Sequence, residues 1–160
     1  MTSSPLSTVA RAAASEANRG PGVTEAGYGA YDSNMTEFTV NLANRPGMLA
    51  ALTETLAAAG VMIEALAAFG LDEEGHVRVI VDNADATRQA LRSAGLTSSE
   101  RSVLTATLSP RPTSLAEMTR SLADSGINID AMYLLNSCAD GLEYAVAVNE
   151  PDRARAHLQA

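Results

Sequence analysis

The sequence predicts an α+β fold in which one β-α-β-β-α unit occurs twice, each time with an antiparallel sheet. The first observation is an internal repeat, because residues 38–92 align without a gap onto residues 104–158. The second is the spacing of apolar residues. In some segments every second residue is apolar, as in a strand, and in others apolar residues recur every three or four positions, as in a helix. A match that keeps one register through strands, helices and turns indicates tandem copies of one folding unit.

The matching positions lie in the strands, turns and helices of both copies. Identical pairs include Leu42/Leu108, Arg45/Arg111, Pro46/Pro112, Leu56/Leu122 and Gly60/Gly126. We therefore divide the chain into a flexible tail over residues 1–34, repeat one over 35–100 and repeat two over 101–160. The tail is rich in glycine, serine and proline and has no lasting apolar face. It is either a partner-binding arm or an inert extension.

The elements of repeat one follow from its local pattern. Phe38, Val40 and Leu42 alternate with polar residues, which predicts a half-buried strand. Apolar residues over 49–59 recur at helical spacing, and Gly60 ends that helix. The remaining pattern predicts strands over 61–69 and 77–81, joined by a polar turn over 71–75, and then a helix over 85–94.

Repeat two predicts the same order. Its expected strands are 104–108, 127–135 and 143–148, its helices are 115–125 and 151–159, and its turn over 136–141 contains Cys138. Residues 96–108 are long enough to hold both a last strand of repeat one and the first strand of repeat two. That last strand would complete a ferredoxin-like βαββαβ unit. Repeat two ends without a fourth strand, so either it does without one or another chain supplies an edge. Because open edges invite pairing, we expect a homodimer or a sheet that continues across the repeats.

The composition excludes several kinds of chemistry. The 160 residues include 19 acidic and 11 basic residues, for a net charge of −8. Nucleic acid and anionic membranes are therefore unsuitable partners, because both need clustered cations. All bases are arginine, so no lysine can form a Schiff base or a phosphate loop. One cysteine and two histidines exclude a disulfide framework, a thiolate zinc cluster and a three-histidine site, and we expect no cofactor and no metal.

Targeting features are missing from the sequence. No apolar run approaches the length of a membrane span, and no signal peptide is evident. A lone cysteine without an export signal fits the cytoplasm, which is where we expect the protein.

The turn of repeat one, Asn44-Arg45-Pro46-Gly47, is the first candidate binding site. It leads into a helix, whose first N–H groups are unpaired and carry a partial positive charge. Gly47 lets a ligand approach the backbone, and the amide of Asn44 can hold an ammonium or a carboxylate. Two alternatives stay open, namely that Asn44 caps the helix and that Pro46-Gly47 only makes the turn. Arg45 and its counterpart Arg111 either grip a carboxylate or are solvated.

The strand, the turn and the helix together resemble an ACT domain. The residues that carry the resemblance are Asn44-Arg45-Pro46-Gly47-Met48-Leu49 and Gly60-Val61-Met62-Ile63 in repeat one, and, less closely, Pro110-Arg111-Pro112-Thr113-Ser114-Leu115 and Gly126-Ile127-Asn128-Ile129 in repeat two. The resemblance covers residues 36–160 and is greatest to short, stand-alone tandem ACT proteins without a catalytic domain. It implies a ferredoxin-like fold and a regulatory module of the kind that usually binds amino acids.

The repeats differ where the resemblance implies ligand binding. In ACT domains a site often forms between two domains. One domain supplies the turn, and the other supplies the start of its second strand, where an asparagine is common. Repeat one keeps Asn44 and Gly47 but has Met62 at the strand, whereas repeat two keeps Asn128 but has lost both turn residues. If the repeats pair pseudo-symmetrically, one composite site of Asn44, Gly47 and Asn128 forms per pair. Pairing between chains or back to back would remove this expectation.

The ligand-binding residues predicted in this way lie at the two turns and strand starts. They are Asn44, Arg45, Pro46, Gly47, Met48, Leu49, Met62, Ile127 and Asn128. Met48, Met62 and Met118 indicate adaptable apolar walls near the site, which favours a small aliphatic amino acid as ligand.

Three functions remain open at this stage. The first is a non-catalytic regulatory protein that binds a small amino acid and transmits the bound state allosterically to a partner such as a metabolic enzyme. The second is a non-catalytic small subunit that docks on a metabolic enzyme without a ligand. The third and least supported is a small enzyme. No nucleophile–base pair, metal cage or phosphate cradle can be built from these residues, so we predict no catalytic residues.

Overall fold

The structure, a computed structural model, describes residues 35–138 and 141–158. The tail predicted over residues 1–34 lies outside the described residues. The elements are β1 (Met35–Ala43), α2 (Met48–Ala58), β2 (Ile63–Leu71), β3 (Glu74–Val81), α3 (Ala84–Ser93), β4 (Ser98–Leu108), α4 (Ser114–Asp124), β5 (Ile129–Cys138), β6 (Gly141–Val148), α5 (Pro151–Ala154) and the 3₁₀ helix η1 (Arg155–His157). The predicted α+β class with antiparallel sheets is confirmed.

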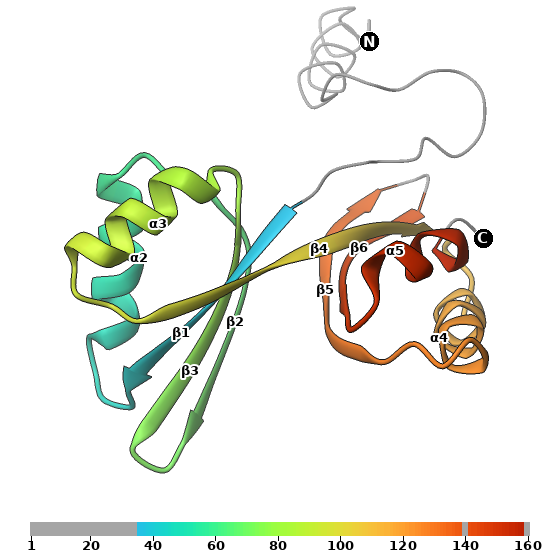
Figure 1. Cartoon of the computed structure of the whole chain (residues 1–160), viewed down its shortest axis with the longest axis horizontal. Coiled ribbons are helices and arrows are strands. Elements are labelled where there is room, and N and C mark those ends of the chain that lie inside the picture. The colour runs from blue at the N-terminus through green and yellow to red at the C-terminus, as the bar shows by residue number, and fades with distance from the viewer. Residues whose placement is uncertain (1–34, 139–140, 159–160) are drawn as a thin grey trace, which may run out of the picture. The chain divides into compact units, whose positions relative to one another are not determined.

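One antiparallel sheet contains all six described strands, in the order β2-β3-β1-β4-β6-β5 (Figure 1). Its central strand β4 serves both repeats, because Ser98–Val103 pairs with β1 and Leu104–Leu108 pairs with β6. Residues 96–108 were predicted to hold a strand of each repeat. This prediction is confirmed, with the difference that one unbroken strand does both. The expected sheet across the repeats is therefore present, and the boundary predicted after residue 100 lies inside β4.

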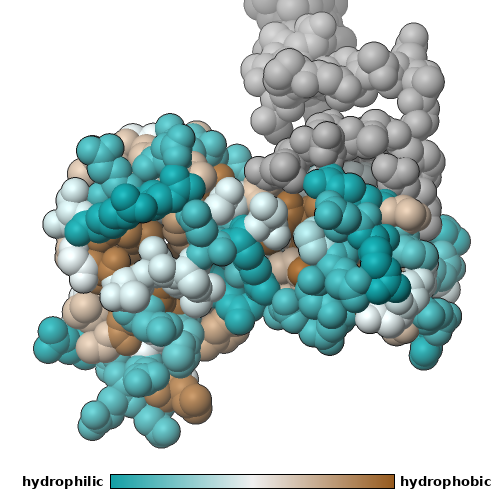
Figure 2. Space-filling view, in the orientation of Figure 1, coloured by the Kyte–Doolittle hydropathy of each residue, from teal (hydrophilic) through white to brown (hydrophobic). Residues whose placement is uncertain are grey.

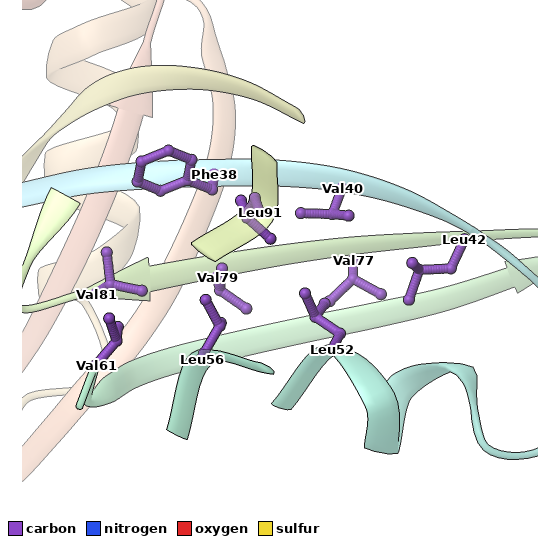
Figure 3. Packing of buried hydrophobic residues seen from close by; sticks show 10 residues of the cluster. All are labelled: Phe38, Val40, Leu42, Leu52, Leu56, Val61, Val77, Val79, Val81 and Leu91. Atoms are coloured by element: carbon purple, nitrogen blue, oxygen red, sulfur yellow. The ribbon is translucent and has the colours of Figure 1, made fainter. Parts of the chain in front are cut away.

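The core of repeat one lies between its sheet and the helices α2 and α3. Leu52 and Leu56 are one helical turn apart on α2, and both are buried. Leu49 and Ala59 share the predicted helical spacing but are exposed, so α2 buries a narrower stripe than the spacing suggests. Figure 3 shows the buried side chains meeting between strands and helices. The cluster is Phe38, Val40, Leu42, Leu52, Leu56, Val61, Val77, Val79, Val81 and Leu91.

Repeat two builds its core in the same way. Met118 and Leu122 on α4 are buried against alternate residues of β4 and β6. Both first helices end at a glycine, because the chain turns with φ of 70° at Gly60 and 71° at Gly126, a conformation that a Cβ disfavours. Among the described residues, repeat two contributes three strands, β4, β6 and β5.

The two repeats also pack against each other through the sheet face that carries no helix, called here the helix-free face. The buried members of this third cluster come from both repeats and are Ile80, Val103, Ala145 and Ala147. Partly buried residues of β1, β2 and β5 surround them, including Met35, Ala65, Ala131 and Tyr133. Small side chains allow the two helix-free faces to approach closely, so the repeats are joined both by β4 and by this apolar contact.

Three predicted boundaries were wrong. The polar turn expected over 71–75 is confined to Asp72 and Glu73, because β2 and β3 continue their ladder to the pair Leu71 and Glu74. Asp72 makes this tight turn with φ of 51°, which aspartate tolerates better than most residues. Cys138 is the last residue of β5 rather than a turn residue, because β5 stays paired with β6. The helix expected over 151–159 is only a short α-helical turn followed by η1.

Candidate functional site

The turn of repeat one is held by the tip of the β2–β3 hairpin. The backbone N–H of Asn44 donates to the Glu73 carbonyl oxygen at 2.8 Å. Its side-chain Nδ2 donates to the Asp72 carbonyl oxygen, also at 2.8 Å. The amide lies so close to Gly70 that a Cβ built there would be 2.7 Å from Nδ2. Asn44 therefore does not cap α2. Its nitrogen is committed to the hairpin, and its Oδ1 has no described hydrogen-bond donor.

Gly47 begins α2 with an exposed backbone. It adopts φ of 90° and ψ of −17°, and no side chain caps the helix. The Ala51 N–H bonds to the Gly47 carbonyl, and the Met48 N–H reaches the Arg45 carbonyl at 3.3 Å. The next two amides, of Leu49 and Ala50, have no described acceptor. Because unpaired amides and the helix dipole attract negative charge, this helix start can seat a carboxylate.

The other turn residues in repeat one surround this helix start. Arg45 and Pro46 are exposed, and the guanidinium of Arg45 makes no ion pair with any described residue. Met48 is half-buried and packs against the core of repeat one, while Leu49 remains exposed. The surroundings thus combine open amides, one cation and apolar side chains.

The matching turn of repeat two has a different chemistry. Thr113 stands where repeat one has Gly47, and its φ of −87° is ordinary. Arg111 is engaged by Glu117, at 3.2 Å from Nη2 to Oε2. Ser114 is buried, and its Oγ has no hydrogen-bond partner among the described residues. The two turns share a pattern of backbone hydrogen bonds. Only the first combines a left-handed glycine with an arginine that makes no ion pair among the described residues.

The strand-start residues lie apart from the turn of repeat one in the hydrogen-bond network. Asn128 forms its hydrogen bonds with other residues of repeat two. Its N–H donates to Asn149 Oδ1 at 2.9 Å, and its Nδ2 donates to Asp130 Oδ1 at 2.6 Å. Ile127 is buried in the core of repeat two, so it positions Asn128 without being exposed itself. Met62 is 66% exposed. No hydrogen bond or ion pair within 35–138 and 141–158 joins the Asn44 turn to Asn128, and the composite site stays a prediction.

Sequence reasoning missed a polar cluster at the junction of the repeats. Glu37 of β1 is 1% exposed, yet its carboxylate accepts bonds from Arg101 Nε at 2.8 Å and from the Tyr133 hydroxyl at 2.5 Å. Arg101 also pairs with Asp130 across the junction, at 3.2 Å. Burial, and then the hydrogen bond to Glu37, raises the pKa of Tyr133 to about 12. A buried carboxylate needs such partners, so this cluster links the repeats.

The position of Glu37 in the strand pattern explains why it was missed. It alternates with the buried Phe38, and this position normally faces solvent in a half-buried strand. Only the contact between the two helix-free faces buries it. The single local signal was a glutamate in an otherwise neutral strand, which does not reveal a distant partner.

The described residues contain no group of three or more His, Cys, Asp and Glu side chains that could hold a metal ion. None of the helices described here combines the length and apolarity needed to cross a membrane.

Two α+β units that share a central strand, each with a turn leading into its first helix, define a tandem α+β protein. A sequence model of the ACT domain pair family matches residues 33–158. The chain belongs to this family. ACT domains are typically regulatory, non-catalytic modules. A comparison with curated protein sequences found no match.

Solved structures with the same fold support this assignment. Protein BT0572 from Bacteroides thetaiotaomicron superimposes with a TM-score of 0.70 at 23% identity, covering 79% of this chain and 89% of that chain. The regulatory subunit of aspartate kinase from Thermus thermophilus, in a ligand-free form, gives 0.60 at 17% identity, with 79% and 91% covered. Its counterpart from Thermus flavus gives 0.55 at 18%, with 79% and 92% covered. At these sequence identities the similarity shows that the fold is shared.

Proposed function

We propose that this protein is a non-catalytic regulatory module of the cytoplasm that binds a small amino acid and transmits the bound state to a metabolic enzyme. The observation that carries the proposal is the start of α2. Gly47 exposes the unpaired N–H groups of Leu49 and Ala50 there, beside an unpaired Arg45. This arrangement suits a carboxylate, because donors and positive charge converge on one small volume.

The ammonium group of the ligand would lie at Asn44. Because Nδ2 of Asn44 is engaged by the Asp72 carbonyl, the oxygen Oδ1 is the part of the amide available to accept from a cation. Met48 and Leu49 would supply an apolar wall, which favours an aliphatic side chain. Carboxylate, ammonium and side chain would each have a distinct neighbour, as specific recognition of an amino acid requires.

A second domain would complete the site with Asn128. Its Nδ2 is held by Asp130, so it too presents an oxygen. Ile127 anchors this position from the core, and Met62 offers an adaptable exposed side chain near its own strand start. A ligand that binds between two domains favours the arrangement that brings them together, and a partner sensitive to that arrangement would respond.

The enzyme partner is proposed from the solved structures. Two of them are regulatory subunits of aspartate kinase, and one is the complex described as aspartokinase alpha and beta subunits, with a TM-score of 0.58 at 18% identity. A non-catalytic module of the kind proposed here would act through such a partner.

The proposal is tested by a thermal-shift panel of the twenty amino acids on the full chain, followed by calorimetry on any ligand found. A ligand at 100 times its dissociation constant stabilises the folded state by about 2.7 kcal/mol. Asn44→Ala and Arg45→Ala should weaken binding at least tenfold, since each removes a charge-assisted contact. The matched control is Arg111→Ala at the corresponding turn of repeat two, which should leave binding unchanged. If the protein is folded and no amino acid shifts its melting temperature, the proposal is contradicted. The alternative of a small subunit that docks on an enzyme without a ligand is then favoured.

A further inference from the structure

The two asparagines of the proposed ligand site are held in different ways. Asn44 is fixed by the hairpin of its own repeat, through the Asp72 carbonyl at 2.8 Å. Asn128 is linked to the other repeat, because its Nδ2 donates to Asp130 at 2.6 Å and Asp130 pairs with Arg101 at 3.2 Å. Arg101 lies in the part of β4 that pairs with β1 of repeat one. The side chain of Asn128 is therefore connected to the junction of the repeats.

The far end of this chain of contacts is buried. Glu37 is 1% exposed, and its two oxygens accept from Arg101 Nε at 2.8 Å and from the Tyr133 hydroxyl at 2.5 Å. A buried carboxylate has no water to replace a lost partner, so Glu37 holds the guanidinium in one place. The nitrogen Nη2 of Arg101 is also buried and has no acceptor among the described residues. The position of Arg101 therefore depends on Glu37 and Asp130. Hydrophilic surface lies over the region where the repeats meet, on the face shown in Figure 2.

Asp130 divides its two carboxylate oxygens between the junction and the candidate site. Oδ2 accepts from Arg101, and Oδ1 accepts from Asn128. The backbone carbonyl of Asp130 accepts from Arg78 of β3 at 3.3 Å, so a second arginine that belongs to the sheet of repeat one holds the same position. The backbone of Asn128 is fixed separately, since its N–H donates to Asn149 Oδ1 at 2.9 Å. The junction thus acts on the side-chain amide of Asn128 rather than on its backbone.

The orientation of this amide decides which ligand group it can bind. An asparagine side chain has a donor end and an acceptor end, and rotation about its last bond exchanges them. The Nδ2 of Asn128 is committed to Asp130, and its Oδ1 has no described donor, so the oxygen is available to a cation such as an ammonium group. If the carboxylate of Asp130 were released, the amide could turn its NH2 group outward, which suits an anion. The contacts of Asp130 therefore select the chemistry of Asn128.

We propose that Arg101 is a positioning residue that couples the junction of the repeats to the orientation of the Asn128 amide. Its guanidinium is a rigid fork that fixes Glu37 and Asp130 relative to each other. Asp130 in turn holds the amide so that its oxygen accepts from an ammonium group. The inference rests on the proposed function in this last step alone, where the ammonium group belongs to a bound amino acid.

Coupling of this kind is reciprocal. An amino acid bound at Asn128 would stabilise the closed junction by as much as the closed junction favours its binding. Repeat one has no equivalent network, because Met62 stands at the position that matches Asn128 and Met35 at the position that matches Arg101. The junction of the repeats is therefore coupled to the Asn128 half of the proposed site and not to the Asn44 half.

The positioning is tested without a ligand, by the side-chain amide signals of asparagine in nuclear magnetic resonance spectra of the ¹⁵N-labelled full chain. Arg101→Lys keeps the charge but loses the fork that contacts both carboxylates. The Asn128 signals, assigned with Asn128→Ala, should shift toward those of a free asparagine side chain. Their exchange with water should become about tenfold faster, as the loss of a hydrogen bond to a charged group predicts. The Asn44 signals in the same spectrum should not move, because the hairpin of repeat one holds that amide.

Arg88→Lys is the matched control. Arg88 also contacts two carboxylates, those of Asp85 and Glu100, and its side chain is 34% exposed against 30% for Arg101. Arg88 lies on α3, outside the junction, so this variant should leave the Asn128 signals unchanged.

Glu37→Gln reaches the same amide from the buried end. Glu37 makes no described hydrogen bond to Asn128, yet this variant removes the charge that holds Arg101 and should move the Asn128 signals in the same direction. Circular dichroism checks that each variant is folded. Unchanged Asn128 signals in a folded Arg101→Lys or Glu37→Gln protein would overturn the inference. Asn44 signals that move as far as those of Asn128 would overturn it as well, because the change would then be general.

The panel of twenty amino acids, repeated on Arg101→Lys and Arg88→Lys, tests the step that involves a ligand. An amino acid that stabilises the wild type should bind Arg101→Lys about tenfold more weakly, because the acceptor oxygen of Asn128 is no longer fixed. Arg88→Lys should bind it as the wild type does. Equal binding by all three proteins would overturn the coupling to the ligand. If no amino acid binds the wild type while the Asn128 signals respond to Arg101→Lys, the proposed function fails and the positioning of Asn128 stands.

Discussion

The two repeats agree in their interiors and differ at their surfaces. Leu56 and Leu122 occupy matching positions and are both fully buried. At the turns and strand edges, by contrast, repeat one has a left-handed glycine, an unpaired arginine and a row of exposed apolar side chains. Repeat two has Thr113, a paired Arg111 and one exposed leucine on its edge. One scaffold can thus carry two different surfaces, because packing restricts the core and leaves the rim free to vary.

The junction shows the same contrast at a buried position. Glu37 and Val103 match in the repeat alignment, and both are buried at the junction. Repeat one therefore places a carboxylate where repeat two places an apolar side chain. The carboxylate is stabilised by Arg101 and Tyr133, so the junction gains directional contacts that an apolar pair would lack.

The largest expected effect tests whether the two cores are one cooperative unit. Leu56→Ala and Leu122→Ala should each lower the free energy of unfolding by about 2–5 kcal/mol, because each opens a cavity in a close-packed core. Since β4 belongs to both repeats, chemical denaturation followed by circular dichroism should show a single shifted transition for either variant. Leu49→Ala and Leu115→Ala, at exposed matching positions, are the controls. Two transitions, of which each variant moves one, would show that the repeats unfold independently.

A smaller effect is expected at the junction. Glu37→Gln should cost about 1–3 kcal/mol, because it removes the charge that Arg101 and Tyr133 contact in a buried setting. Glu100→Gln provides the comparison, since Glu100 pairs with Arg88 at 3.0 Å in partly exposed surroundings. That variant should cost less than about 1 kcal/mol. Urea denaturation of both variants measures the difference, and equal losses would mean that Glu37 does not act as a buried anchor.

The smallest effect compares the matching acids Glu64 and Asp130. Burial raises the pKa of the Glu64 carboxyl, and the carboxylates of Asp82 and Glu143 raise it further. A raised pKa means that the folded state binds the proton more tightly than the unfolded state. Stability from this group is therefore present below the unfolded pKa and is lost as pH rises through the folded pKa. Glu64→Gln should flatten that decline and raise stability at pH 7 by about 0.5 kcal/mol or less.

Asp130→Asn should have the opposite sign, because Asp130 pairs with Arg101. We expect a loss of about 0.5–1 kcal/mol at pH 7, since the pair is partly exposed. Thermal denaturation across pH 4–8 measures both variants beside the wild type. A loss of stability in Glu64→Gln at pH 7 would contradict the repulsion assigned to that position.

The turn at Asn44 illustrates how far the sequence predicts the candidate site. The spacing located the turn, the helix behind it and the glycine at its start, because these features depend on neighbouring residues. It left open whether Asn44 caps the helix, and the structure shows that the amide bonds to Asp72 instead. Asp72 is far from Asn44 in the sequence, so only the folding of the β2–β3 hairpin against the turn could decide this contact.

Glu37 and Leu66 illustrate what the sequence could not reveal. The strand pattern alone places Glu37 in solvent, but the second repeat buries it. The pattern treats Leu66 as an ordinary strand residue, but the sheet order places it at an edge. In both cases a residue's environment is decided by chain segments that lie in other elements.

The sequence by itself therefore determined the duplication, the order of strands and helices, the glycines that end the first helices and most of the buried apolar positions. Periodicity and turn chemistry depend on residues that are close together in the sequence. They can therefore be recognised without knowing which distant segments pack together. The tertiary structure decided that one strand serves both repeats, that the helix-free faces meet, that Glu37 is buried and that β2 and β5 are the ends of the sheet. Each of these depends on pairing between distant segments, where hydrogen bonding and burial are settled by the whole fold and not by local preference.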